Sequence, residues 1–516
     1  MAVIFFEQKE TGQEETAENL EDLELLNKNI RDSHIDKRIK EQLPFLKDFE
    51  LFTDTAGAPY ISIKKEKRGY ITNDHLFDLN DKVFNEWLTK CFFDNDLPSS
   101  NSNVSKIIKI LRARARVNNN SKTFHNRIAE HDGKFYYNNS KGSIIEITPD
   151  GWSKRPGPGD NYDYKPPIYF HWYTHQYSNN PEKGEYDIKE LLKYIPIPDD
   201  SDKMLFLVYL ITAIIPKIQH PVLHCYGPGG SGKSTIVMIL NGLIDPSNSV
   251  EQDFPLSERD AYMLLNNHYL STYDNVTGIK VWLNNILCKA STGATMSTRG
   301  LHTSSKEVFF ELYRCVCIFS TDQIITRPDL LDRSILMKLC RVAEIVPETI
   351  EHRILEYRFN REKGIIFGAM LDVVSRAMSI YPTLKLKNLP RMADFAMWGE
   401  AVSQAIGYEP ELFYNVYKQN ISKQTEEIIA KSTLFQSIIM FMQDKTEWKG
   451  LTKELHDALK SLITPDISKE DFPKHCKDLK TPISRMDTYL KNVGIQVTFL
   501  PRSTEGYLIL IRKVVQ

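Results

Sequence analysis

Residues 227–234 of the chain have the sequence GPGGSGKS, which matches the phosphate-binding pattern G-x-x-x-x-G-K-[ST]. The glycines allow the backbone to curl so that successive N–H groups point toward the phosphates of a nucleotide. We expect Lys233 to reach the β- and γ-phosphates and the Ser234 hydroxyl to hold Mg²⁺. The residues predicted to bind the nucleotide are Gly227, Pro228, Gly229, Gly230, Ser231, Gly232, Lys233, Ser234 and Thr235.

The segments on both sides of this loop have the patterns that such a site requires. Residues 221–226 (PVLHCY) are typical of a short buried strand, and residues 235–240 (TIVMIL) are typical of a helix. The helix would then direct its N-terminus, with its positive dipole end, at the phosphates. The alternative, a glycine-rich turn that binds nothing, is disfavoured because both flanks fit.

A second candidate group is Asp274, at the end of the strand-like segment 268–275 (HYLSTYDN). Ligands of parallel sheets bind at the carboxyl ends of the strands, so Asp274 is predicted to hold Mg²⁺, through water. The alternative is a solvated turn residue. The next residue, Asn275, stands where many hydrolysing relatives have Glu; an amide can orient a water molecule but cannot accept its proton.

A third segment, residues 316–322 (VCIFSTD), predicts another buried strand that ends in polar residues. Ser320 and Thr321 are the candidate sensors of the γ-phosphate or of the attacking water. Two arginines follow, Arg327 and Arg333, and such a side chain can stabilise transition-state charge from a neighbouring subunit. We expect Arg333 to act in this way, but the sequence leaves the choice with Arg327 open. The alternative is an ordinary ion pair, such as Asp332 with Arg333.

The whole-chain properties are those of a globular protein of several domains. Of the 516 residues, 41% are hydrophobic, and the net charge of −2 provides no general attraction to nucleic acid. The seven cysteines form no C-x-x-C pair, which indicates reduced cysteines. No segment resembles a signal peptide or a membrane span, so we expect a cytoplasmic location without a membrane partner.

The pattern along the chain predicts an α/β fold with five regions. The ATPase core is preceded by an arm and a mixed α+β module, and it is followed by a helical lid and a winged-helix domain. The predicted regions are an acidic flexible arm at 1–45, a DNA- or partner-binding module at 46–186, the phosphate-loop ATPase core at 187–342, the lid at 343–428 and the winged helix at 429–516.

The order of five segments resembles the ATPases of plasmids, phages and integrated mobile elements, which are similar to superfamily 3 helicases and to the helicase half of primase–helicase proteins. These segments are residues 227–234, 273–275, 291–299, 327–333 and 389–396. The resemblance implies an AAA+-like core that forms a ring, commonly a hexamer, and uses ATP and Mg²⁺ to move along single-stranded DNA. Such proteins usually carry Asn at the sensor position, where this chain has Ser320 and Thr321.

The resemblance also implies a DNA-contacting hairpin between the Asp274 strand and the sensor strand. Arg299, His302 and Lys306 would contact phosphates there, and the alternative is a solvated β-turn. No primase signature precedes the core, so a primase or polymerase would be a separate partner.

Two other groups of cations are candidate DNA surfaces. The first group could bind DNA, and it could equally form a solvated helix face. The second group surrounds a predicted helix at 482–492, which could read a duplex origin or could instead contact a protein partner. The first group consists of Lys106, Lys109, Arg112, Arg114, Arg116 and Lys122, and the second of Lys474, Lys477, Lys480, Arg485 and Lys491.

The sequence therefore predicts an ATP-dependent DNA helicase or translocase that acts in the replication of a mobile element, with Lys233, Asp274, Asn275 and Arg333 as its catalytic residues. The alternative is an ATP-dependent origin-binding initiator or helicase loader with little unwinding activity. A small-molecule kinase fits poorly, because the hairpin, the distal arginine and the flanking domains would have no use.

Overall fold

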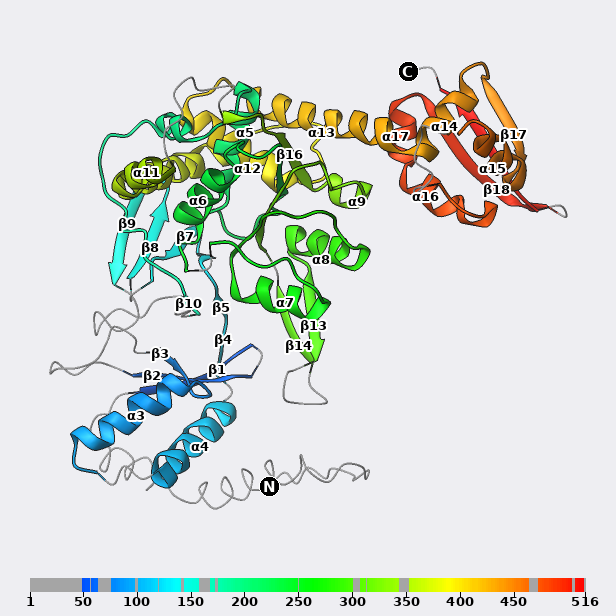
Figure 1. Cartoon of the computed structure of the whole chain (residues 1–516). Coiled ribbons are helices and arrows are strands. Elements are labelled where there is room, and N and C mark those ends of the chain that lie inside the picture. Colours follow the sequence, from blue (N-terminus) through cyan, green and yellow to red (C-terminus); the bar gives the residue numbers. More distant parts are fainter. Residues whose placement is uncertain are drawn as a thin grey trace, which may run out of the picture. The chain divides into compact units, whose positions relative to one another are not determined.

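The computed structural model describes residues 49–514, apart from 56, 64–75, 98–100, 119, 141–142, 157–167, 172–174, 249, 300–306, 312, 343–351, 464–471 and 504–505. The predicted arm at 1–45 therefore lies outside the described residues. The chain divides into two compact units (Figure 1). Of the described residues, those within 49–148, 152–178 and 296–310 belong to unit 1, and those within 149–151, 179–295 and 311–514 belong to unit 2.

Unit 1 begins with a small sheet that has two helices on one face. The strand order is β3-β2-β1-β4, in which β1 is antiparallel to β2 and parallel to β4. Apolar residues spaced three or four apart on both helices pack on the sheet residues Leu51, Ile61 and Phe77. The elements are β1 (Phe49–Asp54), β2 (Pro59–Ile63), β3 (Leu76–Asp78), α3 (Lys82–Asp94), α4 (Asn101–Val117) and β4 (Ser121–Lys122).

An antiparallel meander follows in unit 1. Its first hairpin turns at Asp132 and Gly133, which have φ angles of 50° and 71°. The meander consists of β6 (Ile128–His131), β7 (Lys134–Asn138), β8 (Ser143–Thr148) and β9 (Gly151–Pro156). Two further pairs are β5 (Phe124–His125) with β10 (Tyr169–Phe170), and β13 (Thr295–Arg299) with β14 (Glu307–Glu311).

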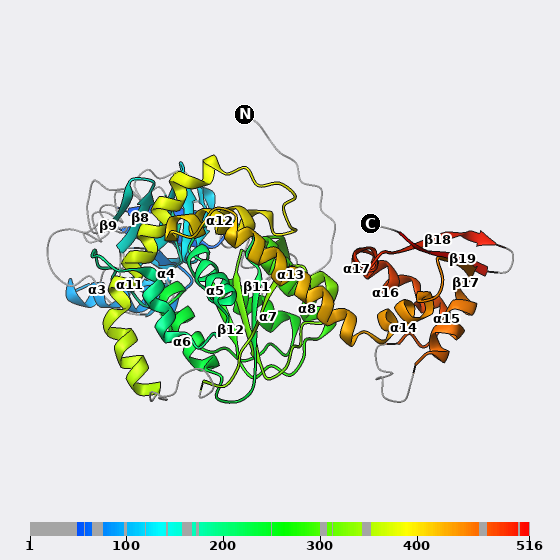
Figure 2. The same cartoon turned by 90° about the horizontal axis from the view of Figure 1, so that it is seen from above.

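Unit 2 contains a parallel sheet whose strand order is β12-β15-β11-β16. These strands are buried on both faces except at Lys338, as expected of a sheet that is covered by helices on both sides. In Figure 2, β11 and β12 lie between α5 and α6 on one side and α7 and α8 on the other. The strands are β11 (Val222–Tyr226), β12 (Leu270–Tyr273), β15 (Cys315–Ser320) and β16 (Ser334–Lys338).

The helices around this sheet alternate with its strands. Residues 204–212 of α5 are all buried, because this helix lies in the middle of the unit; the hydroxyl of Tyr209 donates to the carbonyl of Val316 in β15 at 3.4 Å. The helices are η2 (Ile188–Tyr194), α5 (Asp200–Thr212), α6 (Lys233–Ile244), α7 (Glu258–Asn267), α8 (Val281–Thr292) and α9 (Pro328–Leu331).

Three longer helices continue unit 2 through the region predicted as a lid. The side chain of Asn420 bonds to both the N–H (3.3 Å) and the C=O (2.9 Å) of Leu336, and so covers the edge strand β16. By length and composition the helical stretch 353–383 could cross a membrane, but 61% of its apolar 18-residue window is buried inside the protein. The elements are α11 (His352–Ile380), η3 (Tyr381–Thr383), α12 (Ala393–Ile406) and α13 (Leu412–Lys431).

The C-terminal module, residues 432–514, combines short helices with the antiparallel sheet β17-β19-β18. The sequence predicts one helix near 482–492; the structure instead has two short ones, since the backbone leaves the helical region at Met486 (φ −93°, ψ 2°). The elements are α14 (Thr433–Met442), β17 (Glu447–Leu451), α15 (Thr452–Ser461), η4 (Cys476–Asp478), α16 (Lys480–Arg485), α17 (Asp487–Asn492), β18 (Ile495–Ser503) and β19 (Gly506–Lys513).

Candidate nucleotide site

The glycine-rich loop lies between β11 and the first turn of α6, at the carboxyl edge of the parallel sheet. The Nζ atom of Lys233 lies over the loop, 2.7 Å from the carbonyl oxygen of Gly227 and 3.0 Å from that of Pro228. Helix α6 starts after Gly232, which has no side chain to cap the free N–H groups of the first turn. These N–H groups and the ammonium could bind an anion, and residues 228–230 and Ser234 are exposed to solvent.

Glycine is required at two positions of this loop for different reasons. Gly232 has a φ of +77°, and an added Cβ would also collide with the Pro196 ring. A Cβ at Gly227 would collide with the carbonyl of Leu339, the residue after β16. At Gly229 an added Cβ would meet nothing within 4 Å. The first two glycines therefore shape the loop, whereas Gly229 leaves room above it.

Asp274 follows directly on β12, at the same edge of the sheet. Its Oδ1 accepts the backbone N–H of Asn275 at 2.7 Å, and Asn275 adopts a left-handed conformation with φ 55°. The N–H of Val276 donates to the carbonyl of Phe319 at 3.1 Å, which fixes this turn against β15. The hydroxyl of Ser234 and the carboxylate of Asp274 are oxygen donors of the kind that Mg²⁺ prefers, so the residues fit this ion.

Strand β15 separates the glycine-rich loop from Asp274, because it pairs with β11 on one side and β12 on the other. The carbonyl of Ser320 accepts the N–H of Gly227 at 3.1 Å. The Ser320 hydroxyl is buried and lies 2.8 Å from Nε2 of His224, whereas Thr321 and Asp322 are exposed at the strand end. Of the two predicted sensors, Thr321 is thus the solvent-facing one; its hydroxyl donates to the Asp322 carboxylate at 3.0 Å.

The two arginines flank the short helix α9. Arg327 forms a two-point ion pair with Asp329, both contacts being 3.3 Å, and Asn284 of α8 donates to the same carboxylate at 3.1 Å. Nη1 of Arg333 donates to the backbone carbonyl of Asp329. Burial lowers the pKa of Arg333 from its ordinary value. Arg333 stays charged, since the ordinary arginine pKa is far above neutral pH.

The carboxylate of Asp332 has other partners than the Arg333 considered in the sequence. The hydroxyl of Tyr489 donates to its Oδ1 at 2.7 Å, and Nη1 of Arg391 lies 3.9 Å from its Oδ2. The alternative of an Asp332–Arg333 ion pair is therefore replaced by an Asp332–Arg391 pair. Of the two arginines, Arg327 is therefore the one that forms an ion pair with a carboxylate of α9.

The predicted DNA contacts of the hairpin fall largely outside the described residues. Arg299 ends β13, but its side chain is not described, and His302 and Lys306 lie in the segment 300–306. The hairpin of β13 with β14 is itself present. These three contacts therefore remain predictions.

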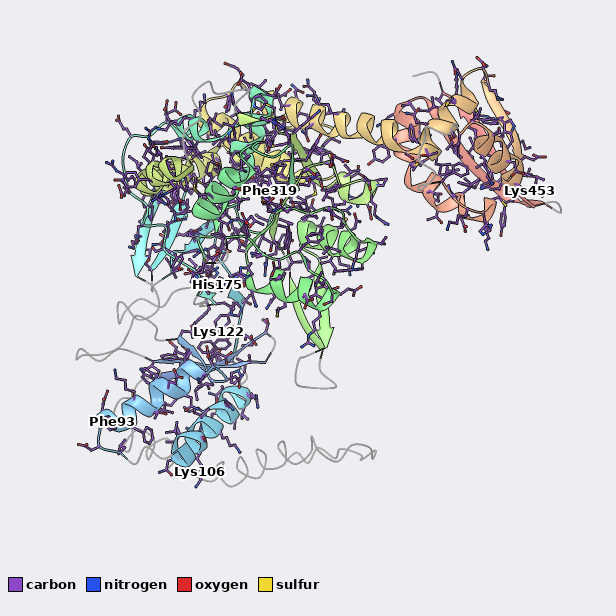
Figure 3. All side chains as sticks on the ribbon, in the orientation of Figure 1. Phe93, Lys106, Lys122, His175, Phe319 and Lys453 are labelled. Atoms are coloured by element: carbon purple, nitrogen blue, oxygen red, sulfur yellow. The ribbon has the colours of Figure 1, made fainter. Side chains whose placement is uncertain are left out.

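The six predicted cations near α4 do not form one surface. Lys106, Lys109 and Arg116 are exposed, whereas Nε of Arg112 donates to the carbonyl of Leu79 at 3.0 Å. Lys122 pairs with Glu50 at 3.5 Å and lies away from the end of α4 that carries Lys106 (Figure 3). Of the C-terminal group, the exposed members are Lys474, Lys477, Lys480 and Lys491, and the side chain of Arg485 is not described.

Four site residues were missed in the sequence because only the fold brings them to the site. His224 belongs to the strand before the loop, and Asn284 to a helix that shows no motif. Asp322 ends the sensor segment, where its position after a buried strand was the signal available. Tyr489 is far from the site in sequence, and no pattern marks it.

The comparisons with known proteins indicate a replication protein. Residues 188–420 match the family model described as the actinomycete integrative conjugative element replication protein, and residues 434–515 match the model of the RepA C-terminal domain of the same elements. None of the curated proteins matches the chain.

Solved structures give distant likenesses. The NrS-1 C terminal region is similar at 14% identity and a TM-score of 0.40, over 92% of this chain and 98% of that chain. A JCV helicase is similar at 13% identity and a TM-score of 0.24, over 46% of this chain and 65% of that chain.

Proposed function

We propose that the chain is a replication protein of this conjugative-element family and that it works as an ATP-driven DNA helicase or translocase. The observation that carries the proposal is the meeting of the phosphate loop, Asp274 and the end of β15 at one edge of a parallel sheet. The strand order supports an AAA+-like core of the superfamily 3 kind. Residues 432–514, with helices followed by a β-hairpin, would be a winged-helix domain.

In this proposal the chain binds ATP with the phosphate loop and Lys233, while Ser234 and Asp274 hold Mg²⁺. The ion would neutralise charge on the phosphate oxygens. Asn275 orients the attacking water, and Thr321 contacts the γ-phosphate or that water. Arg333 stabilises the transition-state charge on ATP held by a neighbouring subunit of a ring, which we take to be a hexamer.

The base that receives the proton of the water is a separate question, since Asn275 cannot take it. We assign this role to Asp322. Its carboxylate is exposed at the end of β15, the strand between the phosphate loop and Asp274, and Thr321 donates to it. In this proposal the carboxylate would lie near the γ-phosphate, and it can accept a proton where an amide cannot.

DNA is the proposed partner. Single-stranded DNA would occupy the ring and contact Arg299, His302 and Lys306, and a duplex origin would bind the exposed lysines of the C-terminal module. Lys106, Lys109 and Arg116 of α4 offer a smaller cationic face in unit 1. A separate primase or polymerase would complete the replication machinery.

A second candidate function is an origin-binding initiator or loader that uses ATP to assemble rather than to unwind. Two observations favour it: Asn275 replaces the usual acid, and the Ser320 hydroxyl is bound to His224 instead of facing the nucleotide. In this case ATP would bind and stabilise an oligomer, but hydrolysis would be slow.

ATP hydrolysis with and without single-stranded DNA decides between the two functions. We expect turnover that rises with DNA, because a motor links hydrolysis to movement along a strand. The Lys233→Ala variant should lose it, since the phosphates lose their cation. ATP binding without turnover, in a wild-type chain that still assembles, would contradict the motor and favour the initiator.

A further inference from the structure

The phenol of Tyr489 makes a hydrogen bond that joins two distant parts of the sequence. Tyr489 lies in α17 of the C-terminal module and is 5% exposed. Its hydroxyl is 2.7 Å from Oδ1 of Asp332 and 3.4 Å from the carbonyl of Pro328. These acceptors belong to the first turn of α9 and to the residue that caps its end. Arg327 and Arg333 therefore flank a helix that is hydrogen-bonded to the C-terminal module.

A helix of four residues cannot fix its own orientation, because one turn has too few internal hydrogen bonds to be stable alone. Its position depends on tertiary contacts. On one side Asn284 of α8 bonds to Asp329. On the other side Asp332 is bonded to Tyr489 and lies 3.9 Å from Arg391, just before α12. The Tyr489–Asp332 bond therefore restrains the residue that directly precedes Arg333.

The bond is of the stronger kind, since its acceptor is a carboxylate. Burial first, and then the hydrogen bond to Asp332, raise the pKa of Tyr489 well above its ordinary value. The phenol is therefore protonated, and able to donate, at neutral pH. The carboxylates of Asp332 and Asp329 and the guanidinium of Arg391 are the charged groups that face it.

We propose that Tyr489 is a positioning residue: through Asp332 it holds the turn that carries Arg327 and Arg333, and so makes ATP turnover depend on the docking of the C-terminal module. This inference rests on the proposed function, because it assigns the arginines to ATP hydrolysis. The phenol contacts neither nucleotide nor DNA in this role. Its effect reaches the reaction only through α9.

The test uses the full-length Tyr489→Phe variant, which loses one oxygen and keeps the ring. We expect kcat for ATP hydrolysis to fall about tenfold, because one charge-assisted hydrogen bond is lost. The Kd for a fluorescent ATP analogue should not change. Amide hydrogen exchange in residues 327–334 should become faster. Tyr507→Phe, which changes a 59% exposed tyrosine of the same module, should behave as wild type.

A second variant distinguishes loss of the Tyr489–Asp332 hydrogen bond from a change in the packing of the Tyr489 ring. Asp332→Ala, which removes the acceptor, should also lower kcat, and the double variant Tyr489→Phe/Asp332→Ala should fall no further than Asp332→Ala alone, because the bond is already absent there. Unchanged kcat and unchanged exchange at 327–334 in Tyr489→Phe would overturn the proposal. Faster exchange throughout unit 2 would also overturn it, since Tyr489 would then be a packing residue only.

The exchange measurement distinguishes failure of this inference from failure of the proposed function. If the wild-type chain shows no ATP turnover, the motor proposal fails, but local exchange at 327–334 still reports whether Tyr489 holds α9. If turnover is present and Tyr489→Phe leaves it unchanged, only the inference fails.

Discussion

At the scale of single residues, the candidate site contains groups that would bind the nucleotide and groups that would take part in its hydrolysis. Lys233 and the first turn of α6 offer positive charge to phosphates, and Ser234 and Asp274 offer oxygen ligands to a cation. Asn275 can hold a water molecule, but its amide has no lone pair basic enough to take a proton. The proposed reaction would therefore need a carboxylate from elsewhere, and we assign this role to Asp322 at the end of β15.

We expect Asp322→Asn to lower the rate of ATP hydrolysis by about 10²-fold or more, because an amide at this position cannot accept the proton of water. Binding of a fluorescent ATP analogue should be unchanged, since the phosphate loop is untouched. Single-turnover hydrolysis beside a binding titration measures both. The matched control is Asp444→Asn, an exposed residue of the C-terminal module. Wild-type turnover in Asp322→Asn would remove this residue from the mechanism.

At the scale of elements, the start of α13 depends on a buried acid of α12. Glu400 is fully buried, and its carboxylate accepts the N–H groups of Glu411 (2.6 Å) and Tyr414 (3.2 Å) and the side-chain amide of Gln404 (2.8 Å). The N–H groups at a helix start have no partner within the helix, so a carboxylate there caps them and complements the dipole.

Glu400→Ala should lower the free energy of unfolding of unit 2 by roughly 2–3 kcal/mol, because it leaves buried N–H groups without an acceptor. Urea denaturation followed by circular dichroism measures this loss. Glu409→Ala, which changes an exposed acid nearby, should cost far less. Equal stabilities of the two variants would show that Glu400 does not cap α13.

At the scale of the whole molecule, the proposal requires a second copy of the chain to complete the site. Lys233 and Arg333 lie on different elements of unit 2, and in a ring each subunit would give its arginine to the ATP of its neighbour.

Mixing two inactive variants gives that test. Lys233→Ala subunits keep the arginine, and Arg333→Ala subunits keep the phosphate loop. A mixture should recover a measurable part of the wild-type ATPase rate, because some interfaces then contain one intact half from each variant. Each variant alone should be inactive. No recovery in mixtures that co-assemble would place Arg333 in the site of its own subunit, or outside any site.

The glycine-rich loop between a strand and a helix, and the parallel strands around it, could be predicted from the sequence, because each is determined by a few consecutive residues. Glycine spacing, an apolar strand and an apolar helix each show in a few consecutive residues. The α/β character of the core was predictable too, since alternating apolar strands and helices require a parallel sheet.

The residues that complete the site could not be found in this way. That the Ser320 hydroxyl bonds to His224 depends on the pairing of β11 with β15, strands about ninety residues apart in the chain. That Asp332 bonds to Tyr489 depends on how the C-terminal module packs on α9. Local patterns carry backbone preferences over a few residues, whereas the partner of a polar side chain is chosen by strand order and helix packing, which exist only once the whole chain has folded.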